Sequence, residues 1–178
     1  QLADLAEKHN EELRRYQPKA TVLEFRRSLL REMDFSIERS SMETFIRNFE
    51  EKPQVHIPQP YPDLSSRRVL TMEKLDGYSV ADTERLQAEE VDTKAIADQG
   101  ANMYLDMIFR DGFYHADPHP GNIFVLADHV ICLIDFGMVG KLIKRDKFAF
   151  ANLFIGMAQQ NPRKMADNLR KLAITHQI

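Results

Sequence analysis

The chain has 178 residues, with 24 Lys and Arg against 27 Asp and Glu and a formal net charge of −3 at pH 7. This length suits one domain or one lobe of a larger domain, and the near-neutral balance argues against nucleic acid as a partner, because phosphate-backbone binding needs clustered Lys and Arg. Cys132 is the single cysteine, which excludes an internal disulfide and fits a reducing compartment.

The chain also lacks the features of a membrane-spanning or secreted segment. No apolar run approaches the ~18 residues that a transmembrane helix needs. The first residues, QLADLAEKHN, contain neither an initiator Met nor the basic-then-apolar layout of a signal peptide. We therefore expect a soluble segment of a longer chain, without a transmembrane helix.

The first half of the chain predicts helices followed by extended segments. Apolar residues at helical spacing indicate a helix over 2–13 and a second helical stretch that begins near Thr21. This second stretch is too long for one globular helix, so we expect a break at 33–35. The proline-rich segment 52–63 predicts an extended connector or edge strand, and 68–72 predicts a short strand.

The second half predicts further helices around a hairpin. A helix over 93–109 should end at Gly112, because glycine readily takes the left-handed conformation that closes a helix. A helix over 145–160 should be followed by another, with Asn161 as its N-cap and Pro162 at its first position.

Two short β-branched runs, 123–126 and 130–134, predict a β-hairpin with a polar tip. A turn at 128–129 would place Asn122 opposite Asp135, and the two residues would stay close after a slip of one residue. Amide and carboxylate oxygens suit Mg²⁺, which leaves its other positions to phosphates and water. The hairpin therefore predicts a magnesium site at its open end.

Asp117 lies just before this hairpin, in a loop constrained by Pro118 and Pro120. A carboxylate held in this way can orient a hydroxyl and accept its proton, as phosphoryl transfer requires. The order of Asp117, Asn122 and the Asp135 of an Asp-Phe-Gly sequence matches the kinase order of catalytic Asp, metal-binding Asn and metal-binding Asp.

Two other interpretations of the same residues were open from the sequence. Asp, Asn, Pro and Gly are common in turns for backbone reasons alone, although turn chemistry does not specify this order and spacing. His115, Asp117 and His119 alternate as zinc ligands on an extended strand would, but Pro118 and Pro120 make a regular strand unfavourable there.

The motifs resemble those of the UbiB / AarF-domain (ADCK) atypical kinase family over nearly the whole chain. HADPHPGN (115–122) and LIDFG (133–137) are similar to its catalytic loop and metal-binding motif. EMDFSIE (32–38) is similar to its Glu-x-Asp motif and the helix glutamate that follows, and VLTMEKLDG (69–77) is similar to its strand and hinge.

The resemblance implies a role for each matching residue. Asp117 would be the catalytic aspartate, and Asn122 and Asp135 would bind Mg²⁺. Glu38 would pair with a nucleotide-binding lysine.

The remaining matches imply regulation and adenine binding. Glu32 and Asp34 would tune access to the nucleotide pocket and restrain protein-kinase activity. Met72, Glu73 and Leu75 would form the hinge that faces adenine.

The resemblance implies an α+β, mostly helical fold: a fragment of the protein-kinase-like fold. Residues 1–76 would be the incomplete end of the N-lobe up to the hinge, and 77–178 a helical C-lobe with the catalytic loop. The full-length protein would be a kinase or ATPase that binds ATP or ADP with Mg²⁺ and acts in ubiquinone biosynthesis. Its other partners would be isoprenoid or phenolic lipids and a membrane surface, on the cytoplasmic or organelle-matrix side.

The chain departs from this family at the phosphate-binding elements. All seven glycines lie at Gly77 or later, and the only lysines before Glu38 are Lys8 and Lys19, neither on a predicted strand. We therefore expect the segment to be inactive by itself, with Glu38 exposed or paired with another cation. The alternatives are a small-molecule phosphotransferase of the aminoglycoside-kinase type and a pseudokinase scaffold that binds no nucleotide.

Overall fold

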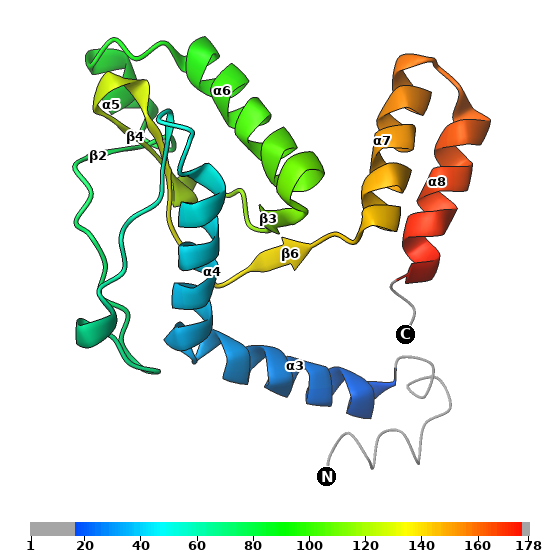
Figure 1. The fold of residues 1–178 in the computed structure, drawn as a ribbon, viewed down its shortest axis with the longest axis horizontal. Helices are drawn as coiled ribbons and strands as arrows, with labels where there is room; N and C mark the ends of the chain where they lie inside the picture. Colours follow the sequence, from blue (N-terminus) through cyan, green and yellow to red (C-terminus); the bar gives the residue numbers. More distant parts are fainter. Residues whose placement is uncertain (1–16, 176–178) are drawn as a thin grey trace.

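The computed structural model describes residues 17–175, so the helix expected over 2–13 lies outside the described residues. The described part is a mostly helical arrangement with small sheets, which confirms the predicted α+β fold class (Figure 1). Its α-helices are α3 (Pro18–Glu32), α4 (Phe35–Phe49), α5 (Thr83–Ala88), α6 (Thr93–Leu105), α7 (Lys144–Ala158) and α8 (Pro162–Thr175). Its strands are β1 (Val55–His56), β2 (Gly77–Ser79), β3 (Phe113–His115), β4 (Ile123–Leu126), β5 (Ile131–Leu133) and β6 (Val139–Lys141).

The predicted break between two consecutive helices is confirmed. α3 ends at Glu32 and α4 begins at Phe35, and the two helices meet at an angle in Figure 1. Asp34 between them is the N-cap of α4, where its side chain accepts a hydrogen bond from Ser36 N–H. The capping preference of Asp therefore decides where the second helix starts.

A four-stranded sheet in the order β1-β5-β4-β2 contains the predicted hairpin at its centre. β1 lies at one edge and runs parallel to β5, which confirms the edge-strand interpretation of the proline-rich segment. The strand predicted over 68–72 is wrong, because only isolated bridges form there, Pro60 with Met72 and Ser66 with Val69. The Tyr61 and Glu73 N–H groups form the two hydrogen bonds around Pro60, and the pairing stops because the Thr71 N–H donates to Ser65 Oγ at 3.0 Å instead.

The hairpin forms with a register one residue away from the predicted one. Ile123 pairs with Leu133, so Asn122 lies opposite Ile134. Asp135 is the next residue along the chain after the one that Asn122 faces. The Ile134 N–H donates to the Asn122 carbonyl at 3.0 Å. The cause is the tip: the three-residue turn η4 (Ala127–His129) replaces the expected two-residue turn, and its central residue has φ 56°.

The core lies between α4, the hairpin and α6. Side chains from all three elements are almost fully buried: Met42, Phe45, Phe49, Met103, Val125, Ile131 and Leu133. Gly100 of α6 faces the hairpin, where an added Cβ would make an ordinary van der Waals contact of 3.6 Å with Ile131 Cδ1. This core makes the hairpin a rigid platform for the residues at its open end.

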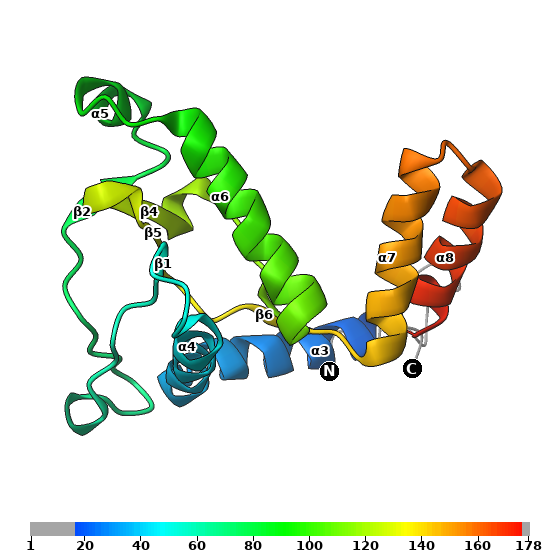
Figure 2. The ribbon, with the colours of Figure 1, turned by 45° about the horizontal axis from the view of Figure 1, so that its top comes forward.

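The predicted ends of the later helices are largely confirmed. α6 continues into a π-helical turn, η2 (Asp106–Asp111), and Gly112 ends it in the left-handed conformation at φ 65°. Asn161 accepts from Lys164 N–H at 3.1 Å as the N-cap of α8. α7 and α8 pack on each other away from the sheet (Figure 2). Within residues 17–175 no helix has both the length and the apolar character needed to cross a membrane.

Candidate functional site

His115 connects the loop of Asp117 to the strand that leads to Asp135. Its side chain is buried, with Nε2 donating to the Ile134 carbonyl at 3.0 Å and Nδ1 accepting from the Asp117 N–H at 3.3 Å. This pairing requires the neutral ring with its proton on Nε2. Its ring also meets Phe136 edge to face, with centroids 5.5 Å apart. From the sequence, His115 stood out only as a zinc-ligand candidate, and no signal in the sequence indicates this connection.

Asn122 lies at the end of the short helical turn η3 (Pro120–Asn122) and contacts Asp117 directly. Its Nδ2 donates to the Asp117 carbonyl at 3.3 Å and to Asp117 Oδ2 at 3.2 Å. With the nitrogen facing Asp117, the amide oxygen of Asn122 is left to accept from another group. The structure thus brings the predicted catalytic and metal-binding residues Asp117 and Asn122 together.

Asp135 lies just beyond β5 with its carboxylate exposed to solvent. Its φ of 60° is unusual for a residue other than glycine, and its Oδ1 accepts from the Gly137 N–H at 3.3 Å. The next residue, Phe136, is fully buried against Phe45, with ring centroids 5.2 Å apart. Burial of Phe136 anchors the turn, so that the Asp135 side chain is held at the surface beside the open end of the hairpin.

The oxygens at this end fit a hard divalent cation. Asn122 would contribute an amide oxygen and Asp135 a carboxylate, the combination that Mg²⁺ accepts while keeping water or phosphate ligands. The zinc interpretation fails, because both ring nitrogens of His115 are engaged and His119 Nδ1 accepts from the Gly121 N–H at 3.1 Å. Across residues 17–175 no group of three or more His, Cys, Asp or Glu side chains is placed to hold a metal ion.

Glu38 on α4 reaches the segment after Asp135. Its Oε1 accepts from the Phe136 N–H at 3.0 Å. Burial raises the pKa of Glu38, the negative charge of Asp135 raises it further, and the hydrogen bond from Phe136 opposes both. The expectation that Glu38 would be exposed or paired with a cation is wrong for the described residues: it is half-buried and bound to a backbone N–H.

Glu32 and Asp34 lie beside the same segment. They line a cavity of about 200 Å³ together with Glu38 and Gly137. Asp34 Oδ2 also accepts from the Arg67 guanidinium, with both nitrogens at 2.9 Å.

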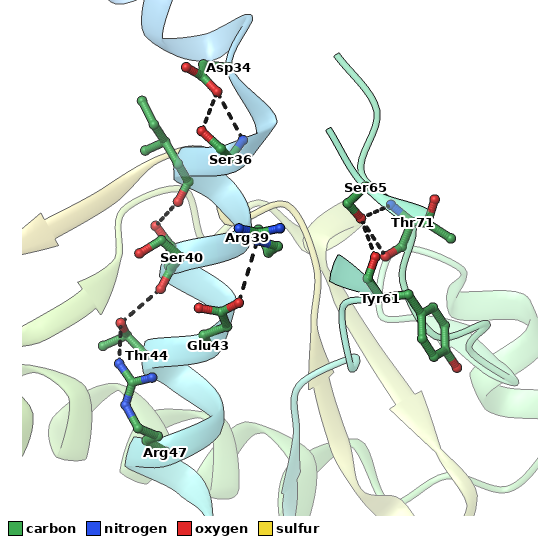
Figure 3. Close-up of polar contacts among 12 residues, drawn as sticks. Asp34, Ser36, Arg39, Ser40, Glu43, Thr44, Arg47, Tyr61, Ser65 and Thr71 are labelled. Carbon is green, nitrogen blue, oxygen red and sulfur yellow. Dashed lines mark hydrogen bonds and ion pairs between the residues drawn. The ribbon is translucent and has the colours of Figure 1, made fainter. Parts of the chain in front are cut away.

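Asp34 has a clear local role as well. Figure 3 shows it capping α4 through both the N–H and the hydroxyl of Ser36. The Ser36 hydroxyl is the largest influence on the pKa of Asp34, which is lowered, and Arg67 contributes in the same direction. Asp34 therefore fixes where α4 begins and hence where Glu38 lies.

The predicted hinge residues lie at the other end of the hairpin. Glu73 and Leu75 line a cavity of about 600 Å³ whose wall includes Leu126 and Val130 beside the hairpin tip. Glu73 Oε2 accepts from His56 Nε2 at 2.9 Å and from the Gln59 N–H at 3.1 Å. The structure therefore does not bring the side chain of Glu73 to Asp117, Asn122 or Asp135.

Met72 next to this cavity packs on the hydrophobic core. Burial raises the pKa of Glu73, but hydrogen bonds from Gln59 and His56 outweigh it and leave the pKa lowered. Glu73 thus remains a carboxylate that ties the predicted hinge to β1.

The comparison with sequence families identifies the family of this chain. The family model for the ABC1 atypical kinase-like domain matches residues 1–169. The chain belongs to the ABC1 atypical kinase-like family. Curated relatives of this ABC1-like chain include the "Probable protein kinase UbiB" of Klebsiella pneumoniae, 37% identical over 158 residues. The protein of the same name from Pectobacterium carotovorum is 38% identical over 158 residues.

The ABC1-like chain spans 29% of the length of these relatives, while the alignments cover 86% of the chain itself. A solved structure supports the fold independently. The Mycobacterium tuberculosis protein Rv3197, determined as a complex with erythromycin, has a TM-score of 0.59 and 21% identity. It is matched over 79% of the ABC1-like chain and 35% of its own chain.

Proposed function

We propose that the full-length protein is an ATP-dependent phosphotransferase or ATPase whose Mg²⁺ is held by Asn122 and Asp135 and whose catalytic residue is Asp117. The hydrogen bond between Asn122 Nδ2 and Asp117 Oδ2 at 3.2 Å carries this proposal. It joins a proton acceptor and a metal ligand in one unit at the open end of the hairpin. Membership of the ABC1 atypical kinase-like family supports the same chemistry.

Each residue of this cluster would perform one step. Bound Mg²⁺ would neutralise phosphate charge, the main requirement of phosphoryl transfer. Asp117 would orient the attacking hydroxyl or water and accept its proton. Asn122 would hold the Asp117 carboxylate through its amide nitrogen, while His115 fixes the backbone on either side.

The other residues would serve nucleotide binding and its control. The backbone of the hinge, at Met72, Glu73 and Leu75, would meet adenine. Glu32 and Asp34 would control access to the cavity beside Glu38, whose lining they share. The division between an N-lobe part and a C-lobe part at residues 76 and 77 remains a prediction.

The names of the relatives suggest the pathway. We propose a role in the biosynthesis of ubiquinone or a similar isoprenoid quinone lipid, by analogy with the relatives called UbiB. The substrate or regulator would then be a phenolic or isoprenoid lipid at a membrane surface, with no role for nucleic acid.

The experiment measures the thermal shift of the full-length protein with ADP or ATP, with and without Mg²⁺. A ligand at about 100 times its Kd stabilises the folded state by roughly 2.7 kcal/mol. We expect a Mg²⁺-dependent shift that Asp135→Asn abolishes. Asp128→Asn is the matched control, since Asp128 is also an aspartate at positive φ on this hairpin but lies at its tip.

Three outcomes would contradict parts of the proposal. An unchanged shift in Asp135→Asn would remove the metal assignment, and no shift in a folded wild type would favour the scaffold alternative. ATP turnover that phenolic lipids do not stimulate, but that a soluble aminoglycoside stimulates, would favour a small-molecule phosphotransferase.

A further inference from the structure

The long loop between β1 and β2, residues 57–76, reaches the start of α4 through Arg67. The Phe35 N–H donates to the Arg67 carbonyl at 3.1 Å. The Arg67 side chain binds Asp34, with Nε and Nη2 each 2.9 Å from Asp34 Oδ2, although the two residues are 33 positions apart in the chain. One backbone contact and one charged contact therefore hold the loop against the first turn of α4.

The ion pair lies at an acidic edge of the molecule. Asp34 shares the lining of one cavity with Glu32 and Glu38, so three carboxylates gather beside the segment that follows Asp135. Asp34 is half-buried, whereas Arg67 is exposed. An exposed ion pair contributes little to overall stability. The consequence of this pair is therefore to be sought in what Asp34 holds in place.

Asp34 leads directly to the turn that carries Asp135. Its Oδ1 caps α4 by accepting from the Ser36 N–H at 3.1 Å. One turn further along the same helix, Glu38 Oε1 accepts from the Phe136 N–H at 3.0 Å. The first turn of α4 thus has the ion pair with the loop at one end and the hydrogen bond to the residue after Asp135 at the other.

We propose that Arg67 is a positioning residue for Asp135: by holding Asp34 it fixes the first turn of α4 and, through Glu38, the turn that carries Asp135. Among residues 17–175 the hydrogen bonds and ion pairs of Arg67 reach only Asp34 and Phe35, so its effect on bound Mg²⁺ is indirect. The inference rests on the proposed function, because it takes Asp135 as a ligand of Mg²⁺.

The first test measures the Mg²⁺ concentration that gives half of the thermal shift of the full-length protein with ADP. We expect Arg67→Gln to raise this concentration by roughly 3- to 10-fold. ADP binding without Mg²⁺ and the melting temperature without ligand should stay close to those of wild type, because the lost ion pair is exposed. An unchanged Mg²⁺ requirement in Arg67→Gln would overturn the proposal.

Arg27→Gln is the matched control. Arg27 also forms an exposed ion pair, with Glu24 at 3.5 Å, but both partners lie within α3 and join no second element. The control should leave the Mg²⁺ requirement unchanged. An equal effect of Arg27→Gln and Arg67→Gln would mean that loss of one positive charge is sufficient, and it would overturn the specific role of Arg67.

A conservative variant and a double-mutant cycle trace the effect to Asp34. Both Arg67 nitrogens converge on one oxygen, so the single ammonium of Arg67→Lys can replace them and should restore most of the Mg²⁺ affinity. Asp34→Asn removes the charge but keeps a good N-cap, and in that background Arg67→Gln should have little further effect. Equal losses in both backgrounds would mean that Arg67 acts elsewhere, for example on a nucleotide phosphate, and would overturn the proposal.

Hydrogen exchange of the full-length protein without nucleotide gives a readout that does not depend on Mg²⁺ or activity. If Arg67 holds the start of α4, Arg67→Gln should speed the exchange of the segment that contains the Phe136 N–H several-fold. The amides of β4 and β5 should exchange as in wild type. Unchanged exchange at Phe136 would show that the loop and the turn are not coupled.

The two proposals can fail separately. If Asp135→Asn leaves the Mg²⁺-dependent shift intact, the metal assignment is wrong, while the exchange at Phe136 still decides whether Arg67 holds this turn. If Asp135→Asn abolishes the shift but Arg67→Gln changes neither the Mg²⁺ requirement nor the exchange, only the role of Arg67 is wrong.

Discussion

The carboxylate of Glu38 accepts a hydrogen bond from the Phe136 N–H at 3.0 Å, although the two residues are 98 positions apart in the chain. This contact joins α4 directly to the residue that follows Asp135. Because Phe136 is also fully buried against Phe45 of α4, the helix and the turn that contains Asp135 form one packed unit. A movement of α4 would therefore displace Asp135.

Replacing Glu38 should change how stability depends on pH. Because the folded-state pKa is raised above the ordinary value of 4.5, the stability that Glu38 contributes is fully present at low pH and is lost as pH rises through the folded-state pKa. Glu38→Gln keeps an acceptor for the Phe136 N–H but cannot ionise. We expect the variant to gain stability relative to wild type as pH rises from about 4.5 to 7.

Urea denaturation of both proteins at several pH values measures this difference. If the difference in unfolding free energy between wild type and Glu38→Gln stays constant with pH, Glu38 is solvated in the folded state and the prediction is wrong. Glu38→Ala should be less stable than Glu38→Gln at every pH, since it leaves the Phe136 N–H without its acceptor.

Replacing His115 should destabilise the fold because the ring satisfies two backbone groups at once. His115→Phe keeps an aromatic ring against Phe136 but leaves the Ile134 carbonyl and the Asp117 N–H without partners. We expect the free energy of unfolding to fall by about 2 kcal/mol or more, measured by chemical denaturation.

The matched control is His119→Phe, the same substitution four positions along. His119 is exposed, and water can replace its bond to the Gly121 N–H. The free energy of unfolding should fall much less for His119→Phe than for His115→Phe. Equal losses at the two positions would mean that burial of the His115 hydrogen bonds contributes nothing.

Gly112 and Gly100 predict opposite effects of the same substitution. Gly112 has φ 65°, and a Cβ there would lie 2.7 Å from the Leu142 carbonyl oxygen. Gly112→Ala should therefore lower the free energy of unfolding by roughly 1–3 kcal/mol. Gly100 lies inside α6, where a Cβ would make an ordinary contact of 3.6 Å with Ile131. Gly100→Ala should therefore raise the free energy of unfolding by about 0.5–1 kcal/mol.

Chemical denaturation of the two variants separates backbone strain from helix propensity. Destabilisation by Gly100→Ala comparable with that by Gly112→Ala would mean that α6 and the hairpin cannot tolerate one added methyl group. That result would contradict the packing described between them.

Local signals in the sequence determined much of the architecture. The break before α4, the end at Gly112 of the π-helical turn that continues α6, and the cap of α8 at Asn161 each depend on a few neighbouring residues, and all three were predicted. The order of Asp117, Asn122 and Asp135 is likewise a property of one short stretch, and it indicated the kinase-like family.

Only the tertiary structure decided what these residues contact. The bonds from Glu38 to Phe136 and from His115 to Ile134 join segments distant in the chain, and the hairpin register shifted by one residue because a three-residue turn was favoured at its tip. The strand expected over 68–72 failed for the same kind of reason: the Thr71 N–H donates to Ser65 Oγ, which ends the pairing with the proline-rich segment after a single bridge. Such pairings depend on which surfaces pack together, and no local pattern encodes them.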